Sequence, residues 1–207
     1  MHFQRKIQDA INKRNRAKLT NYEPTLICSN CLGGFLYHWL GLRFMSPFIN
    51  LYLTNDDFLL ALENWNFFIN CQIQEDLESD TSYPVGIVKI PAGGIIKIHF
   101  LHYKSFQEAI MKWKDRCKRI DQDNIGVILS NWNGNVNILN RFERLPFSHK
   151  VVLTDKPYPV YPHSYYIKGY KLNSGRNIWA TKTVFGKRYI DQFDYVSFIN
   201  SLNHRGE

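Results

Sequence analysis

Residues 28–34, CSNCLGG, place two thiols, a hydroxyl, an amide and two glycines at the end of a short apolar run. A thiol beside the first amides of a helix has a lowered pKa, because the helix dipole stabilises its thiolate. We therefore predict Cys31, or else Ser29, as a nucleophile. The alternative is a tight turn with a half-buried cysteine, and the residues alone leave both readings open. The groups expected to hold an oxyanion or part of a donor are Asn30, Gly33 and Gly34.

Residues 99–104, HFLHYK, can supply a base for such a nucleophile. His102 stands where a predicted strand gives way to a helix, a position from which its imidazole can accept a proton. Tyr103 and Lys104 beside it are expected to contact the substrate. His163 is a second choice for the proton shuttle and also a substrate-binding candidate. The alternative is that these histidines are structural hydrogen-bonding groups.

A basic helix is predicted over residues 105–120. Lys112, Arg116 and Arg119 lie near one face of this helix, and the guanidinium fork suits phosphate or carboxylate. We expect this face to bind the phosphates of a donor, either a coenzyme A thioester or a nucleotide-sugar. The alternative is a solvated charged face that pairs with the acidic residues 74–80.

Aromatic residues are abundant, with 14 Phe, 12 Tyr and 5 Trp. Rings that the core does not bury can stack on sugars. Several of them follow predicted strands together with polar side chains. The further substrate-binding residues that we expect there are Trp132, Asp155 and Tyr158.

Several cofactor motifs are absent from the sequence. Cys28 and Cys31 form a CxxC pair, but no second CxxC or CxxH follows, so we expect no structural zinc site. Neither the GxGxxG fingerprint nor the GxxxxGK[ST] phosphate loop occurs. The nearest approaches to a DxD metal site, Asp56-Asp57 and residues 121–123, fall at a helix cap and in a loop. We therefore predict no metal ligands.

The composition predicts one sizeable core, because 44% of the 207 residues are hydrophobic and 21% are charged. The net charge of +8 favours phosphate-bearing partners. No nucleic-acid-binding module is recognisable, so nucleic-acid binding is not expected. No signal peptide and no run of about 18 apolar residues occur. We expect a cytoplasmic protein with reduced thiols, whose membrane contact is at most peripheral to the inner membrane or through an assembly complex.

Strands and helices alternate along most of the chain. Because the strands TLIC, GVILS and KVVLT lack polar alternation, both faces of their sheet should be covered. We therefore predict a three-layer α/β sandwich, Rossmann-like and mostly parallel, with one edge hairpin. A basic helix over residues 1–22 should precede a single α/β domain over 23–207. The predicted helices are 1–18, 35–41, the segment after 55–57, 105–120, 135–146 and 191–202. The predicted strands are 25–28, 48–54, 83–90, 95–102, 125–132 and 150–155, and residues 165–185 are predicted to be β-like.

Longer stretches carry a family resemblance. SNCLGGFLYHWLGLRFMSPFINLY, YPVG, IKIHFLHYKSFQEAIMKWKDRCKRI and NRFERLPFSHKVVLT resemble, in this order, a bacterial family of unknown function. Its members are often labelled exopolysaccharide or capsular polysaccharide biosynthesis proteins. Family members usually read SNNCWGG at the first motif, whereas this chain has Cys28 and Ser29 at the first two positions and Leu32 in place of Trp. The resemblance implies an α/β fold and a role in surface polysaccharide synthesis, without naming a reaction.

Three functions remain open from the sequence. The first is acyl transfer to a polysaccharide precursor, with Cys31 or Ser29 attacking the donor; a looser likeness to polysaccharide acetyltransferase-like proteins related to the SGNH hydrolases supports it. The second is sugar transfer from a nucleotide-sugar. The third is a non-catalytic module that binds polysaccharide or an assembly partner. All three require the polar ends of separate strands to meet in one cleft.

Overall fold

Four parallel strands form the central sheet, in the order β1-β5-β6-β7. The structure is a computed structural model that describes residues 2–132, 134–170 and 177–202. Every residue of the first three strands is buried, as their unbroken apolar runs predict. The strands are β1 (Thr25–Cys28), β5 (Ile125–Asn131), β6 (Lys150–Thr154) and β7 (Ser164–Tyr166).

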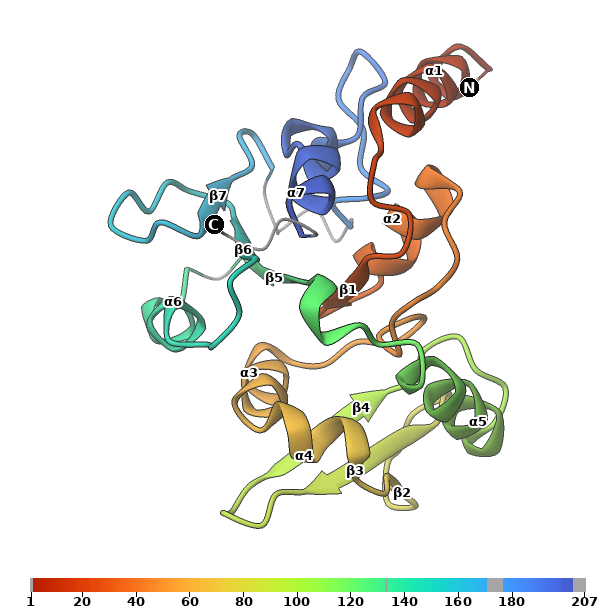
Figure 1. Cartoon of the computed structure of the whole chain (residues 1–207), viewed down its shortest axis with the longest axis vertical. Coiled ribbons are helices and arrows are strands. Elements are labelled where there is room, and N and C mark those ends of the chain that lie inside the picture. The colour runs from red at the N-terminus through yellow and green to blue at the C-terminus, as the bar shows by residue number, and fades with distance from the viewer. Residues whose placement is uncertain (1, 133, 171–176, 203–207) are drawn as a thin grey trace.

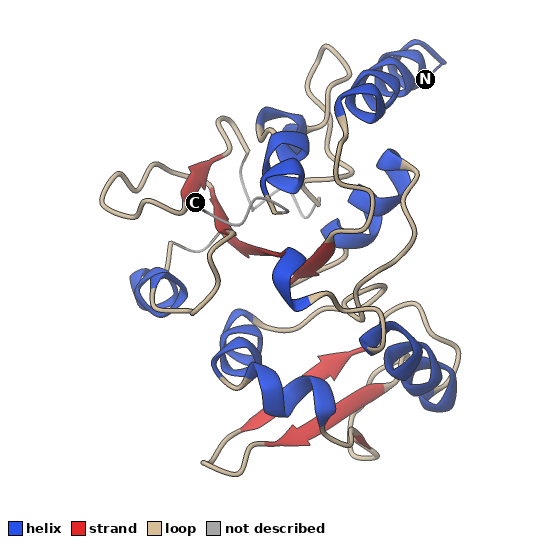
Figure 2. Cartoon of the chain, in the orientation of Figure 1, coloured by secondary structure: helices blue, strands red, loops and turns tan. Residues whose placement is uncertain are grey.

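Helices cover both faces of this sheet (Figures 1 and 2). Successive side chains of a strand point to opposite faces. Leu26 of β1 therefore joins the core beneath α2 (Leu32–Leu40) and α7 (Tyr195–Ser201). Its neighbour Ile27 joins a second core beneath α6 (Val136–Glu143). The predicted α/β class with a parallel sheet is confirmed.

A smaller lobe is formed by residues 55–117, between α2 and β5 in the chain (Figure 1). Its predicted hairpin forms, but it pairs with β2 in a separate antiparallel sheet, order β2-β3-β4, and not at an edge of the parallel sheet. The apolar face of the hairpin is buried with α3, α4 and α5 in the same core that Ile27 joins, so this core connects the smaller lobe to the parallel sheet. The elements of the lobe are α3 (Asn55–Glu63), α4 (Trp65–Asn70), β2 (Gln74–Glu75), β3 (Val85–Lys89), β4 (Ile95–His99) and α5 (Phe106–Cys117).

The predicted strand at residues 48–54 is wrong. This segment alternates buried and more exposed residues, which resembles a strand, but it runs between two different elements. The amide of Leu53 donates to the carbonyl of Ser29, 3.0 Å away, whereas Tyr52 forms a single antiparallel bridge with His99. The backbone hydrogen bonds of this segment thus go to both lobes, so the segment cannot pair along its length with one neighbouring strand.

Helices α2, α3 and α7 begin at other residues than predicted, and α7 starts at Tyr195 and not at residue 191. α2 starts at Leu32, three residues earlier than expected, which brings Cys31 to its N-cap position. α3 is capped by Thr54, whose hydroxyl accepts from the amide of Asp57, so Asn55 is the first helical residue and not the cap. The prediction that Ser105 caps α5 is confirmed, with its hydroxyl accepting from the amide of Glu108.

The two ends of the described chain lie on the same side of the parallel sheet (Figure 1). Of the β-like stretch 165–185, the structure forms β7 and one bridge between Lys182 and Arg188, and residues 171–176 lie outside the described residues. Within the described ranges, every helix is too short or too polar to cross a bilayer. The remaining elements are α1 (His2–Lys18), η1 (Gln122–Asn124) and η3 (Tyr189–Gln192).

Candidate functional site

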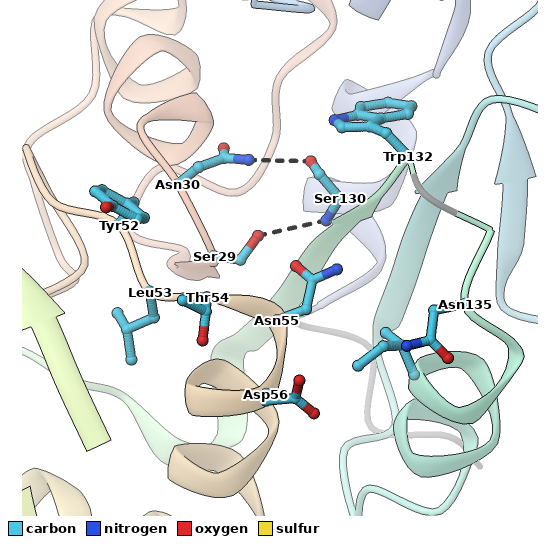
Figure 3. Close-up of a pocket in the computed structure, with 11 residues that line it drawn as sticks. Ser29, Asn30, Tyr52, Leu53, Thr54, Asn55, Asp56, Ser130, Trp132 and Asn135 are labelled. Carbon is cyan, nitrogen blue, oxygen red and sulfur yellow. Dashed lines mark hydrogen bonds between the residues drawn. The ribbon is translucent and has the colours of Figure 1, made fainter. Parts of the chain in front are cut away.

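A polar cleft of about 390 Å³ lies at the carboxyl ends of β1 and β5 (Figure 3). This is the edge of a parallel sheet at which α/β proteins bind ligands. One wall comes from the strand ends and the other from the start of α3, with the start of α6 at the side. The lining residues are Ser29, Asn30, Tyr52, Leu53, Thr54, Asn55, Asp56, Ser130, Trp132, Asn135 and Ile138.

Hydrogen bonds hold the two strand ends together. Because Cys28 is in register with Ile128, the residues that follow them lie side by side. The amide of Ser130 donates to the hydroxyl of Ser29 at 3.4 Å, and the Asn30 side-chain amide donates to the Ser130 hydroxyl at 3.1 Å. These bonds fix the side chains at the floor of the cleft, so a ligand meets donors and acceptors in set positions.

Two helices begin at the cleft. Thr54 caps α3, and Asn135 caps α6 by accepting from the amide of Asn137 at 3.0 Å. The first amides of a helix carry a partial positive charge, which favours an anionic or electron-rich ligand. Asp56 on the rim forms an ion pair with Arg141 of α6 at 2.8 Å, which joins the two helices across the cleft.

Tyr52, which lines the cleft, packs against two other ring side chains. Tyr52 stacks on His99 with ring centroids 4.3 Å apart, and its hydroxyl lies 3.4 Å from that of Tyr83. Burial and the neighbouring Tyr83 raise the pKa of Tyr52 to about 12, and burial lowers the pKa of His99. Both rings are therefore neutral at physiological pH, which suits contact with an uncharged part of a ligand.

Cys31 lies in a different, smaller cavity of about 230 Å³. Its thiol points to the carbonyl of Leu51 at 3.9 Å, and Cys31 does not line the polar cleft. His102 lines the same cavity, so the predicted nucleophile and base are brought together. Ser29 and Asn30 are not part of it. The sequence prediction of a single cleft is therefore wrong, because the chain turns at residues 29–31 and its successive side chains face two cavities.

The pKa of Cys31 is raised by burial, contrary to the predicted lowering. The loss of hydration disfavours the thiolate more than the helix terminus favours it. Cys28 is fully buried, and burial raises its pKa as well. A Cβ atom added at Gly33 would lie 3.0 Å from the sulfur of Cys28, so this glycine lets α2 approach β1 closely.

The predicted phosphate-binding residues of α5 separate in the structure. Arg116 is buried and donates to the hydroxyl of Tyr103 at 2.6 Å, with its guanidinium 5.4 Å from the ring centre of Phe44. Arg119 pairs with Asp115 and donates to the carbonyl of Phe44 at 3.0 Å. Lys112 is exposed to solvent. Both arginines thus contact Phe44, which lines the Cys31 cavity, and neither arginine lines that cavity itself.

The other predicted substrate residues are scattered. Trp132 lines the polar cleft and packs against Tyr170, with their ring centroids 4.7 Å apart. Lys104 is exposed and lines neither cavity. His163 precedes β7 and pairs with Glu143 at 2.5 Å, and it also lines neither cavity. Asp155 and Tyr158 follow β6 outside both cavities, and each has a buried side-chain oxygen without a hydrogen-bond partner among the described residues.

Sequence reasoning missed the α3 wall of the cleft. The sequence pattern predicts a strand at Tyr52 and a helix cap at Asn55, and it does not mark either residue as a ligand contact. The signal that could have found them is a polar cluster, TNDD, that follows an apolar extended run and starts a helix. The same pattern marks Asn135 at the start of α6.

The comparisons with known proteins give a family. A family model described as "Domain of unknown function (DUF1919)" matches residues 2–200. A protein of Haemophilus influenzae, described as an uncharacterized protein, is 41% identical over 205 residues, which cover 94% of this chain and 97% of that protein. Both matches extend over nearly the whole chain, so the cleft and the smaller lobe lie within the matched region. The chain therefore belongs to the DUF1919 family of domains of unknown function.

Proposed function

We propose that the polar cleft binds a sugar substrate and that the protein is a transferase in the biosynthesis of surface polysaccharide, exopolysaccharide or capsule. The observation that carries the proposal is the chemistry of the lining: hydroxyl and amide side chains, one carboxylate and two rings around about 390 Å³. Sugars present many hydroxyl groups and flat apolar faces, which match hydrogen-bonding side chains and aromatic rings respectively. The volume falls within the usual range of small-ligand sites.

A nucleotide-sugar is the donor that this cleft favours. The first turn of α6, which carries no acidic residue, faces the cleft and can receive the diphosphate, as helix N-termini do in other phosphate sites. Trp132 offers a ring face to a base or a sugar. Asp56 on the rim is a carboxylate that can orient or deprotonate an acceptor hydroxyl. In this version Cys31 takes no part in the reaction.

Acyl transfer through Cys31 is the second candidate, supported by the cavity that Cys31 shares with His102. The thiol would give its proton to His102 and attack the carbonyl of a coenzyme A thioester. The acyl group would move to Cys31 as the coenzyme A thiol leaves with that proton, and then to a sugar hydroxyl. Burial of Cys31 opposes this candidate, because little thiolate is present at neutral pH.

Ligand titration tests the choice between the two. UDP-glucose, UDP-N-acetylglucosamine and acetyl-coenzyme A are titrated calorimetrically into the wild-type protein and into Trp132→Ala, Ser130→Ala and Cys31→Ser. We expect a nucleotide-sugar to bind, Trp132→Ala to weaken it at least tenfold, and Cys31→Ser to leave it unchanged. Binding of acetyl-coenzyme A that depends on Cys31 and not on Trp132 would favour acyl transfer. A polysaccharide that binds without any turnover of these donors would favour a non-catalytic module.

A further inference from the structure

Three large apolar side chains project into solvent at one end of the molecule. Phe3 is 74% exposed, Val184 is 94% exposed and Phe185 is 80% exposed. Single exposed apolar residues are common on protein surfaces, but a group of them marks a surface that contacts something else. These three come from opposite ends of the sequence, so their proximity has to be established from the contacts of the chain around them.

Val184 and Phe185 occupy the tip of a small hairpin. The amide of Thr183 donates to Lys187 at 2.7 Å, the amide of Gly186 donates to Thr183 at 2.9 Å, and Lys182 bridges to Arg188. Gly186 has a φ of 78° and takes the left-handed position of this turn, so the two central positions accept most residue types. The turn therefore does not require Val184 and Phe185, and they are not buried in the fold. Their apolar side chains therefore need an explanation outside the fold.

Hydrogen bonds fix this hairpin against α1. The side chain of Gln8 donates to the carbonyl of Gly186 at 3.3 Å, and Arg188 donates to the side chain of Asn12 at 2.8 Å. A Cβ atom added at Gly186 would lie 3.4 Å from the backbone of Gln4, which shows how close the hairpin tip is to the helix. Phe3 is the residue next to Gln4. All three exposed apolar side chains therefore come from the amino end of α1 and from the hairpin tip that packs on it.

Arg188 makes the base of the hairpin rigid. Its guanidinium is 2% exposed, forms an ion pair with Asp191 at 2.8 Å and lies 3.6 Å from the ring centre of Trp39. The buried Arg188 side chain therefore fixes the base of the hairpin, and the apolar tip is not a loosely packed loop. A rigid projection loses little conformational entropy when it inserts into another phase.

Basic side chains surround the apolar tip. Arg5, Lys6, Lys182 and Lys187 are exposed, and none of the four forms an ion pair within the residues that the structure describes. Asp9 is the single acidic residue of α1, against six basic ones. Apolar side chains that project from a basic surface are the combination that binds the headgroup region of an anionic bilayer.

We propose that this surface, formed by the amino end of α1 and the hairpin tip, docks on a membrane with anionic phospholipid headgroups. Phe3, Val184 and Phe185 insert among the acyl chains, while the surrounding Lys and Arg side chains contact the headgroups. The charge favours a bilayer over a second copy of this chain, because two such faces would repel each other. The inference stands apart from the reaction, since none of these residues lines the polar cleft.

Vesicle sedimentation tests the proposal on the full chain. Vesicles of phosphatidylcholine alone are compared with vesicles that contain 30% phosphatidylglycerol, at about 0.1 M and about 0.5 M salt. We expect binding to the anionic vesicles only, and weaker binding at the higher salt concentration because salt screens the charges. Val184→Ser with Phe185→Ser should lower the partition coefficient at least tenfold. Lys6→Gln with Lys187→Gln should lower it by about 25-fold, since each basic residue near an anionic surface contributes about fivefold.

Leu77→Ser provides the matched control, because Leu77 is 87% exposed but belongs to the smaller lobe. It should bind vesicles as the wild type does. Equal vesicle binding by the control and the tip variant would overturn the proposal, provided that circular dichroism shows the same melting temperature for both. Absence of wild-type binding to anionic vesicles would also overturn it. So would a dimer in sedimentation equilibrium without vesicles that the tip variant abolishes, because the surface would then bind a second copy.

Discussion

At the scale of single residues, the two halves of the motif Ser29-Asn30-Cys31 face different surroundings. Ser29 and Asn30 are hydrogen-bonded at the floor of the polar cleft, whereas Cys31 lines a smaller cavity with His102. The sequence correctly placed all three residues at a strand end. It could not separate them, because side-chain direction within a turn depends on backbone angles that residue types alone do not set.

The raised pKa of Cys31 leads to a reactivity prediction. Iodoacetamide should modify Cys31 slowly at pH 7, and its rate should rise as the pH approaches and passes the pKa of an ordinary thiol, because only the thiolate reacts. Peptide mass spectrometry over pH 6.5–10 measures the rate, with Cys28 as an internal reference for a fully buried thiol. Rapid labelling of Cys31 that does not change between pH 6.5 and 8 would contradict the prediction.

His99 leads to a prediction on pH and stability. Burial lowers its pKa, so the folded protein binds fewer protons at this position than the unfolded chain does. Its contribution to the free energy of unfolding is complete above the unfolded pKa of about 6.5 and declines as the pH falls. The positive charge of Lys97 also lowers the pKa of His99, whereas the negative charges of Asp57 and Asp76 raise it.

Urea denaturation at pH 7.5 and pH 5.5 tests this contribution. His99→Phe can keep the stacking contact with Tyr52 but cannot be protonated. We expect the wild type to lose more stability than His99→Phe between the two pH values. Equal losses in both proteins would show that the acid sensitivity comes from other groups.

At the scale of elements, close packing of α2 on β1 positions the motif. Helix α2 begins directly after the turn at residues 29–31, and Gly33 allows its first turn to lie against Cys28. The sequence predicted β1, α5, β5 and β6 well, since each combines a strong periodic or apolar pattern with a clear boundary. It failed at residues 48–54, where burial pattern alone could not reveal that the backbone partners belong to two different lobes.

Adjacent glycines in α2 give a matched pair of variants. Gly33→Ala should lower the free energy of unfolding by about 1–3 kcal/mol, because the added methyl group overpacks the Cys28 side chain. Gly34→Ala should be neutral or slightly stabilising, since the nearest atom, in Ile49, is 3.8 Å away and alanine favours helix. Chemical denaturation of both variants checks the difference, and equal effects would contradict the packing argument.

The capping residue of α3 is a further element-scale test. Thr54→Ala removes the acceptor for the amide of Asp57 and should cost about 1 kcal/mol of stability. Asn55→Ala lies in the first turn and makes no cap, so its effect on stability should be within about 0.5 kcal/mol. Thermal unfolding followed by circular dichroism distinguishes the two. A larger loss for Asn55→Ala would mean that the start of the helix is assigned wrongly.

At the scale of the whole molecule, the polar cleft is assembled from chain segments that are far apart in sequence. The hydrogen bond between Asn30 and Ser130 spans 100 residues, and α3 reaches the cleft from within the smaller lobe's part of the chain. The composition and strand pattern predicted the α/β class. They could not predict that the hairpin belongs to a second sheet in a separate lobe, because local pattern does not specify which sheet a strand joins.

A ligand in the polar cleft should therefore stabilise distant segments together. With UDP-glucose or UDP-N-acetylglucosamine at about 100 times its dissociation constant, we expect about 2.7 kcal/mol of added stability. Amide hydrogen exchange should slow both around residues 53–58 and around residues 130–139, because both segments surround the cleft. Protection confined to the segment around Cys31 and His102 would instead locate the ligand in the smaller cavity.

The insertion of the smaller lobe between two neighbouring strands has a consequence for the order of folding. Strand β1 pairs with β5 alone in its sheet, and the whole lobe must be accommodated before the two can meet. Contacts close in sequence form sooner than those that require a long loop to close. We expect the hairpin and helices of the lobe to fold early and β1 to dock late. The polar cleft would then be completed in the final step, so nascent or partly folded chains could not bind ligand there.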